Sequence, residues 1–271
     1  MMITTGLVAG DGTLPLEIAK KLHRRGKPPV VFALSGYCAD IGEFASDVVR
    51  IAEPRLDLLA AEASARGVDS IILAGRIPKS LMFRPELLDE SLRSLLASLP
   101  VRDDHSLLGA IVAFFESKGV AVLSYKEIVP ELMAPAGTIA GREPTAAELE
   151  DISYGAEIAS AVVPLSFGQT VIVRGRSVVA VEAMEGTDAA IERAGSIAGG
   201  GVVVKLMRPD QDERYDLPTV GTDTLKCMQD ARLSCLAVEA GRTIILGGDL
   251  FRESARSWRI AVTGISPVRS L

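Results

Sequence analysis

Short apolar runs alternate with segments of helical periodicity through residues 3–123. Runs of this kind are typical of buried strands, and the periodic segments are typical of helices that cover a sheet. The runs predict strands at residues 3–9, 28–34, 70–73 and 120–123, and the periodic segments predict helices at residues 15–25, 55–66, 85–98 and 106–118. Because strands and helices alternate, we expect βαβ units with a parallel sheet, a Rossmann-like domain at residues 1–128.

The pattern changes in the second half of the chain. Residues 129–144 hold three prolines and two glycines without a clear period, which predicts a linker. Thr145, followed by Glu148, predicts a capping box at the start of a long helix. The other expected elements are helices at residues 145–162, 188–197, 222–232 and 249–256, and strands at residues 169–173, 177–184, 201–206, 236–239, 243–246 and 259–263, with a hairpin turn at Gly175. We therefore expect a mixed α/β domain at residues 145–271, so the whole chain is of the α/β class.

Composition narrows the chemistry that is available. The chain has 29 basic and 35 acidic residues, a formal charge of −6, and 4% aromatic residues. A nucleic-acid-binding protein needs a basic face and often stacking rings, so we expect no nucleic-acid partner. The two histidines, His23 and His105, lie far apart, and the three cysteines, Cys38, Cys227 and Cys235, form no C-x-x-C pair. These counts disfavour a zinc site, a disulfide framework and a histidine-based triad. If the protein uses a metal, we expect an ion with oxygen ligands. The lack of a disulfide framework favours a reducing cytoplasm as the compartment.

The first motif that could carry chemistry is Gly-Asp-Gly-Thr-Leu-Pro at residues 10–15, between a strand and a helix. A glycine-rich turn at a helix N-terminus exposes backbone N–H groups, so Gly10 and Gly12 are candidates for a phosphate or nucleotide contact. The alternative is an ordinary tight turn capped by Thr13. A dinucleotide site is disfavoured, because Pro15 replaces the third glycine of the fingerprint and no acid ends the second strand.

The second motif is Glu-Ala-Met-Glu-Gly-Thr-Asp at residues 182–188. Glu182 interrupts a run of apolar residues, which is costly unless its carboxylate is paired or binds a cation. Gly186 allows a turn, and Thr187 is expected to cap the next helix, whose N–H groups would face an anion. The alternative is a plain helix start that carries Asp188 because the helix dipole favours an acid there.

The third motif is Arg-Tyr-Asp-Leu-Pro-Thr-Val-Gly-Thr at residues 214–222. Pro218 stiffens the loop that carries Asp216, and the last threonine of the motif is expected to cap the following helix. Asp216 is thus a candidate general base or metal ligand, and Lys205 and Arg214 are candidates for neutralising a bound anion. Alternatively, Asp216 only pairs with Arg214, and Lys205 lies in solvent.

Together, these motifs give the chain a resemblance to the LpxI-type UDP-2,3-diacylglucosamine pyrophosphatases of bacterial lipid A synthesis. The specific part is E-A-x-E-G-T-D followed by D-L-P-T-x-G. The resemblance also includes residues 6–15, Ala74-Gly75, Phe167-Gly-Gln169, Lys205 and Glu239-Ala-Gly241. Residues 51–57 depart from the glycine-rich stretch that similar proteins commonly carry there, which leaves the substrate contacts of that region open.

The resemblance implies two domains with an active site between them, a homodimer, and hydrolysis of UDP-2,3-diacylglucosamine with Mg²⁺ (or Mn²⁺) to UMP and 2,3-diacylglucosamine 1-phosphate, lipid X. It places the essential aspartate at Asp216, with Thr187 and Asp188 beside the lipid-sugar phosphate. The expected metal ligands are Asp216, Glu182 and Asp188. The expected substrate-binding residues are Gly10, Gly12, Gln169, Thr187, Asp188, Lys205, Arg214 and Thr219. We expect a cytoplasmic protein, and peripheral contact with the inner membrane is left open.

Two other classes of protein stay open at this point. The Rossmann-like half alone is compatible with a nicotinamide-dependent oxidoreductase. A non-catalytic protein that senses an acylated sugar nucleotide would use Asp216 only as a ligand contact.

Overall fold

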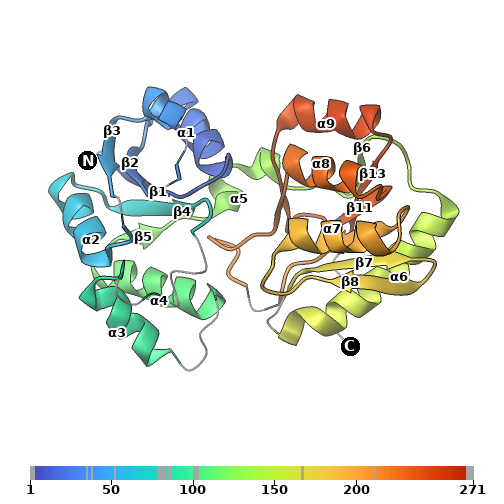
Figure 1. The fold of residues 1–271 in the computed structure, drawn as a ribbon. Coiled ribbons are helices and arrows are strands. Elements are labelled where there is room, and N and C mark those ends of the chain that lie inside the picture. Colours follow the sequence, from blue (N-terminus) through green and yellow to red (C-terminus); the bar gives the residue numbers. More distant parts are fainter. Residues whose placement is uncertain are drawn as a thin grey trace. The chain divides into compact units, whose positions relative to one another are not determined.

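The computed structural model describes residues 4–34, 36–37, 39–51, 53–77, 84, 87–99, 104–165, 168–209 and 211–266, with only the backbone at residues 104 and 105. Of the features discussed above, Cys38, Phe167, the His105 side chain and part of the segment 51–57 lie outside these residues. The chain forms two compact units, which we call unit 1 (Met1–Pro130 and Asp212–Asp216) and unit 2 (Glu131–Gln211 and Leu217–Leu271). Their elements are labelled in Figure 1.

Unit 1 is built around a five-stranded parallel sheet of strand order β3-β2-β1-β4-β5. The strands are β1 (Thr5–Ala9), β2 (Val30–Ala33), β3 (Asp47–Arg50), β4 (Ser70–Ala74) and β5 (Ala121–Val122). The helices are α1 (Leu14–Arg24), α2 (Leu56–Ala65), α3 (Glu90–Ser98), α4 (Asp104–Ser117) and α5 (Tyr125–Ile128), with a 3-10 helix at Ala39–Phe44. The predicted parallel sheet is confirmed; the edge strand β3 was not predicted.

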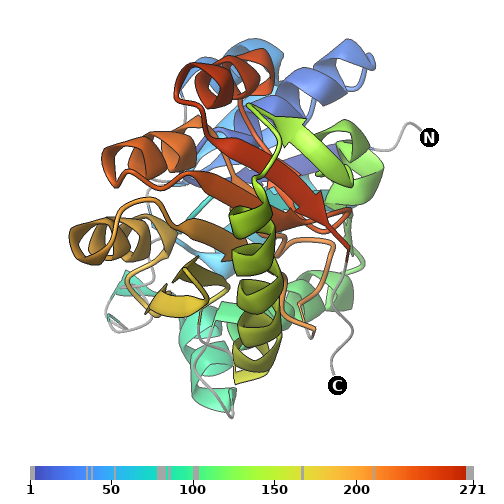
Figure 2. The ribbon, with the colours of Figure 1, turned by 90° about the vertical axis from the view of Figure 1, so that its right-hand side faces the viewer.

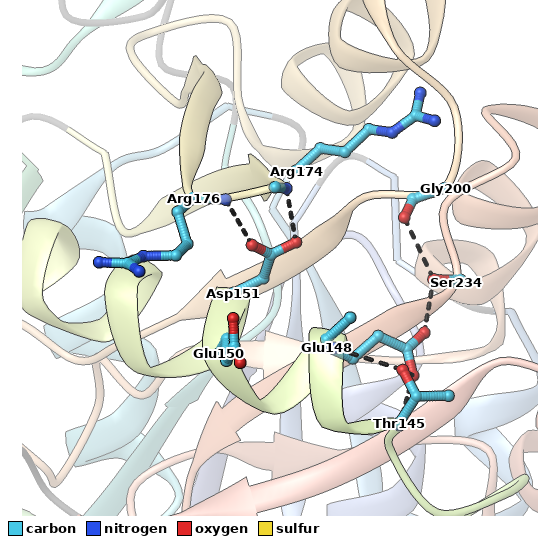
Figure 3. Close-up of a pocket in the computed structure, with 10 residues that line it drawn as sticks. Thr145, Glu148, Glu150, Asp151, Arg174, Arg176, Gly200 and Ser234 are labelled. Atoms are coloured by element: carbon cyan, nitrogen blue, oxygen red, sulfur yellow. Dashed lines mark hydrogen bonds between the residues drawn. The ribbon is translucent and has the colours of Figure 1, made fainter.

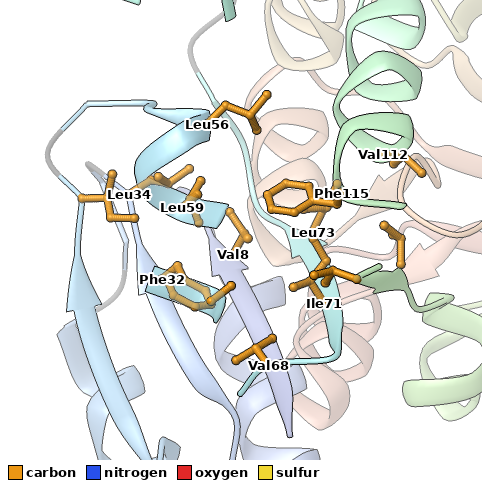
Figure 4. Close-up of a cluster of buried hydrophobic side chains, with 14 of the residues drawn as sticks. Val8, Phe32, Leu34, Leu56, Leu59, Val68, Ile71, Leu73, Val112 and Phe115 are labelled. Atoms are coloured by element: carbon orange, nitrogen blue, oxygen red, sulfur yellow. The ribbon is translucent and has the colours of Figure 1, made fainter. Parts of the chain in front are cut away.

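One apolar core joins this sheet to α2, α3 and α4 (Figure 4). Phe32 on β2 and Phe115 on α4 are fully buried in it. Burial of an apolar side chain of this kind contributes about 1.5–3 kcal/mol to stability. The ring of Tyr215, which comes from a segment much later in the chain, belongs to the same core.

Unit 2 is built around a six-stranded mixed sheet of strand order β6-β13-β11-β9-β7-β8. Its strands are β6 (Gly137–Ala140), β7 (Thr170–Arg174), β8 (Ser177–Val181), β9 (Val202–Lys205), β11 (Cys235–Glu239) and β13 (Ala261–Ile265), and β10 (Thr219–Val220) pairs with β12 (Ile244–Ile245) in a small parallel sheet. The central strands β9, β11 and β13 are parallel, whereas β6, β7 and β8 run antiparallel to their neighbours. The expected mixed sheet is therefore confirmed.

Helices cover both faces of the six-stranded sheet. They are α6 (Ala146–Val162), α7 (Thr187–Ile197), α8 (Thr222–Asp230) and α9 (Gly248–Ser257), with 3-10 turns at Pro130–Leu132 and Val163–Leu165. Figure 2 shows α6 on one face of the sheet and α7, α8 and α9 on the other. One core forms between the sheet and α6, and another forms between the opposite face and α7, α8 and α9. None of the described helices combines the length and the apolar character that a membrane span requires.

Two features at the start of unit 2 concern the sequence prediction directly. The capping box is confirmed, because Thr145 Oγ1 accepts the Glu148 N–H (3.3 Å) and the Glu148 carboxylate accepts the Thr145 N–H (2.8 Å). The segment predicted as a linker contains β6, which pairs with β13. Close backbone packing explains a glycine here, since a Cβ on Gly141 would lie 1.8 Å from the carbonyl oxygen of Ile260.

Candidate active site

The candidate site in unit 2 lies where the parallel strands end. Lys205 is the last residue of β9 and Glu239 is the last residue of β11, so both lie at the same edge of the sheet. The antiparallel strand β7 starts at this edge, with Thr170 paired to Lys205. In open α/β sheets, ligands bind outside the carboxyl ends of the strands, so this edge is the natural place to look for chemistry.

Lys205 is buried at this edge rather than solvated. Its residue is 6% exposed, and its Nζ donates a 2.7 Å hydrogen bond to the hydroxyl of Thr187. That hydroxyl donates in turn to Glu182 Oε1 (3.1 Å), whose second oxygen accepts the Gln169 N–H (3.4 Å). The alternative in which Lys205 lies in solvent is therefore wrong. The structure joins four residues of the sequence prediction into one chain of hydrogen bonds.

Three helices of unit 2 begin with glycine instead of a capping side chain. The N-cap residues of α7, α8 and α9 are Gly186, Gly221 and Gly247, none of which offers a capping side chain. At the start of α8, the Gly221 N–H donates to the Thr224 hydroxyl at 3.3 Å. The expectation that Thr187 and Thr222 act as caps is wrong, since each is the first residue of its helix. Because the first N–H groups of a helix have no intrahelical partner, glycine caps leave donors for an anion.

A buried hydroxyl adds to the polar character of this edge. Thr170 is 1% exposed, and its Oγ1 makes no hydrogen bond with any described residue. Buried polar groups are nearly always hydrogen-bonded, so an exception next to Lys205 is typical of a site that binds a polar ligand or water. The edge near α7 thus combines an ammonium group, a spare hydroxyl and helix N–H donors, a set that suits a phosphate.

The segment after β9 is fixed by two residues whose roles the sequence did not indicate. Gln211 accepts hydrogen bonds from the Arg208 N–H (2.8 Å) and from the Gln169 side chain. Glu239, which is 3% exposed, accepts the Met207 N–H at 2.9 Å. The signal that could have indicated Glu239 is the one used for Glu182, namely an acid at the end of an apolar strand.

Asp216 belongs to unit 1, in the short segment Asp212–Asp216. Arg214, which was expected to neutralise an anion, donates to Asp212 through Nε (2.9 Å) and Nη2 (2.7 Å) and to Glu116 through Nη1 (2.7 Å). Hydrogen bonding to Asp212, and then to Glu116, raises the pKa of Arg214, so the guanidinium stays charged. A role for Arg214 in binding substrate stays a prediction. Thr219, also predicted to bind substrate, donates its hydroxyl to the Leu217 carbonyl at 3.2 Å.

The glycine-rich turn of unit 1 packs against a second turn. Asp11 and Arg76 exchange backbone hydrogen bonds of 2.9 and 2.7 Å, and a Cβ on Gly10 would lie 2.5 Å from the Arg76 carbonyl oxygen. The two turns lie at the carboxyl ends of β1 and β4, where the strand order of the sheet reverses. Thr13 makes no side-chain cap, contrary to expectation. Gly12 has a φ of 106° and open space around it, so its ligand contact stays a prediction.

A pocket of about 480 Å³ lies at the opposite edge of the six-stranded sheet, beside the N-terminus of α6 (Figure 3). Two of its carboxylates, those of Asp151 and Glu148, already have structural partners. Asp151 accepts the N–H groups of Gly175 (2.9 Å) and Arg176 (2.6 Å), and Glu148 accepts the Ser234 hydroxyl (2.6 Å) in addition to its part in the capping box. These contacts hold a hairpin turn and a helix start, so we do not place the reaction there.

The predicted metal ligands belong to both units, Glu182 and Asp188 to unit 2 and Asp216 to unit 1. No group of three or more His, Cys, Asp or Glu side chains with metal-binding geometry occurs among the described residues. The Glu182 carboxylate is engaged by Thr187 and Gln169, Asp188 is exposed in the first turn of α7, and Asp216 belongs to unit 1. The predicted ligand set therefore remains untested.

Comparison with known proteins places the whole chain. Residues 4–132 match the LpxI N-terminal domain and residues 135–263 match the LpxI C-terminal domain. The chain is 28% identical over 275 residues to the UDP-2,3-diacylglucosamine pyrophosphatase LpxI of Caulobacter vibrioides, with 97% of each protein covered.

Similarity to solved structures is weak by comparison. A CobK precorrin-6A reductase is 14% identical with a TM-score of 0.35, covering 99% of this chain and 91% of that one. A biotin carboxylase from Campylobacter jejuni is 13% identical with a TM-score of 0.28, covering 72% of this chain and 42% of that one. Neither similarity carries an argument about function. The two domain matches are decisive, and the chain belongs to the LpxI family.

Proposed function

We propose that this protein hydrolyses the pyrophosphate bond of UDP-2,3-diacylglucosamine to UMP and 2,3-diacylglucosamine 1-phosphate. The name of the Caulobacter relative supports the substrate, and family membership over both domains supports the reaction type. The structural observation that carries the proposal is the buried Lys205 at the uncapped N-terminus of α7, hydrogen-bonded through Thr187 to Glu182. An ammonium buried beside free helix N–H groups is suited to a phosphate ester and poorly suited to a neutral ligand.

Hydrolysis of the pyrophosphate bond changes three bonds. Water attacks one phosphorus, the bridging oxygen leaves with its bonding electron pair, and a proton is lost from the water. Lys205 and the N–H groups at the start of α7 stabilise the negative charge that develops on the phosphate oxygens. Asp216 either orients the water and accepts its proton or holds a cation. It lies two residues before Pro218, which stiffens the loop. Gln169 and Thr187 fix the position of Glu182, and Thr187 also fixes the Lys205 ammonium.

A Mg²⁺ ion fits this donor set. Mg²⁺ is commonly bound by one or two carboxylates together with substrate phosphates, so a ready cluster of three acids is not required. The carboxylates that could serve as its ligands are Asp188 in unit 2 and Asp216 in unit 1, since the carboxylate of Glu182 already has two hydrogen-bond partners. The ion supplies positive charge to the phosphate oxygens when it is bound.

The decisive experiment measures UMP release from UDP-2,3-diacylglucosamine by the purified protein, with Mg²⁺ and with EDTA. We expect turnover that EDTA abolishes and that Asp216→Ala reduces by more than tenfold, a barrier increase above about 1.4 kcal/mol. A wild-type protein that binds the substrate without releasing UMP would be the sensing protein of the alternative hypothesis. Turnover in EDTA would remove the metal from the proposal, and retention of more than a tenth of the rate in the variant would remove Asp216.

Location and assembly complete the proposal and need separate measurements. A homodimer and peripheral contact with the inner membrane follow only from the resemblance. Light scattering of the purified protein tests the first, and sedimentation with anionic vesicles tests the second.

A further inference from the structure

The segment Asp212–Asp216 is held by unit 1, although the residues on either side of it belong to unit 2. Three consecutive residues of the segment make the contacts. Glu213 forms an ion pair with Lys126, Arg214 binds Glu116 at 2.7 Å, and the Tyr215 ring lies in the core of unit 1. Asp216 is the next residue, so the position of its backbone is set by these contacts.

Tyr125 supplies the buried part of this attachment. It is the first residue of α5 and is 3% exposed. Its hydroxyl donates to the backbone carbonyl of Tyr215 (3.1 Å) and to the carbonyl of Leu73, the penultimate residue of β4. Its own N–H donates to the Arg214 carbonyl at 3.3 Å. One side chain thus connects the parallel sheet to the backbone immediately before Asp216.

The phenol is also within electrostatic reach of Asp216. Burial, followed by the charge of Asp216, raises the pKa of the Tyr125 hydroxyl. The phenol has one proton, which the two carbonyls share. Removal of the donor would leave a buried carbonyl without its partner on the residue before Asp216, which the backbone can relieve only by moving.

We propose that Tyr125 is a positioning residue for Asp216, holding its backbone against the β4 end of the unit 1 sheet. The inference rests on the proposed function, because it presumes the role in hydrolysis that is proposed for Asp216. Tyr125 does not touch the reacting atoms; it acts only through the segment that carries Asp216. A displacement of about 1 Å of a catalytic group can cost about a hundredfold in rate, so a single hydroxyl at this place matters.

The test is Tyr125→Phe, which removes one oxygen and keeps the buried ring. We expect kcat for UMP release to fall at least tenfold while KM stays within threefold of wild type, in protein that is folded at the assay temperature. Tyr154→Phe is the matched control: Tyr154 is a half-buried tyrosine on α6 in unit 2, and the change should leave kcat within twofold. A role in stability alone predicts a lower Tm with unchanged kcat per folded molecule, and that result overturns the proposal.

A second variant covers the case in which Tyr125→Phe does not fold. Lys126→Gln breaks the half-exposed ion pair to Glu213 without touching the core, and it should lower kcat severalfold at constant KM. A wild-type kcat in that variant, or an equal loss of kcat in Tyr154→Phe, contradicts the assignment. Failure of the proposed function is distinguishable, because the wild-type protein itself would then release no UMP in the same assay.

Discussion

Replacement of Lys205 by Met separates an effect on activity from an effect on stability. The substitution keeps an unbranched side chain of similar length and removes the ammonium that donates to Thr187 at 2.7 Å in a residue that is 6% exposed. Loss of a charged hydrogen bond costs about 1.5–3 kcal/mol. Lys205 pairs with no carboxylate among the described residues, and burial of such an ammonium carries a desolvation penalty of several kcal/mol, which the variant no longer has. We therefore expect the free energy of unfolding to fall by no more than about 1 kcal/mol, or to rise.

In contrast to this small effect on stability, we expect a large loss of activity. Removal of one preorganised donor to a developing oxyanion typically lowers kcat by about 10²–10³, or about 2.7–4 kcal/mol of barrier. The assays are UMP release under saturating substrate and urea unfolding followed by circular dichroism. Lys226→Met is the matched control, since Lys226 is a 59% exposed lysine on α8 that pairs only with Asp230 in the described contacts. If Lys205→Met is destabilised by several kcal/mol and keeps its kcat, Lys205 is structural and the site has been misassigned.

Two further predictions concern stability. Burial opposes ionisation of Glu148, but hydrogen bonds from Arg142 and other donors lower its pKa to about 2 from 4.5, so its contribution to stability is present above pH 4.5 and is lost as the pH falls from 4.5 toward 2. Glu148→Gln should therefore lower the free energy of unfolding by about 2 kcal/mol at pH 7 and reduce its dependence on pH in the acid range, as measured by urea unfolding. An unchanged pH dependence in the acid range would contradict this. Gly10→Ala should destabilise the protein by about 2–3 kcal/mol in thermal unfolding, because the new Cβ meets a backbone oxygen at 2.5 Å. Gly26→Ala, at a φ of 71° with open space around it, should cost about 1 kcal/mol. Equal losses in the two variants would show that the backbone around residue 10 moves apart without cost.

The sequence predicts the elements of this fold best where the apolar pattern is long and uninterrupted. Strands β1, β2, β4 and β9 are buried along their whole length or nearly so, and each coincides with an apolar run. The edge strand β3 was missed because Asp47 and Arg50 stand at its ends and its middle is only half-buried. The edge strand β6 was missed because its pairing with β13 depends on residues more than 100 positions away.

The candidate site divides in the same way into local and distant parts. The hydrogen bond from Thr187 to Glu182 joins residues five positions apart, and the motif predicted that they act together. The partner of Arg214 on α4 is 98 positions away, and nothing in the local sequence distinguishes a guanidinium that binds Glu116 from one that binds phosphate. The N-caps of α7 and α8 were misassigned by one residue. Threonine is the residue type preferred at an N-cap, but in both helices the backbone places the preceding glycine at that position.

The two edges of the unit 2 sheet explain why the reaction is assigned to one of them. At the edge that holds the pocket of Figure 3, the carboxylates of Glu148 and Asp151 accept several hydrogen bonds from the chain itself, and their energy goes into a helix cap and a turn. At the other edge, among the described residues, three helices have glycine at the N-cap and the Thr170 hydroxyl has no partner, although a capping side chain at that position typically adds about 1 kcal/mol. A fold that places glycine at three N-caps of one edge, and buries Lys205 there, keeps helix N–H donors available for a ligand. The size of the pocket is therefore a poorer guide to the active site than the hydrogen bonds that the chain leaves unmade.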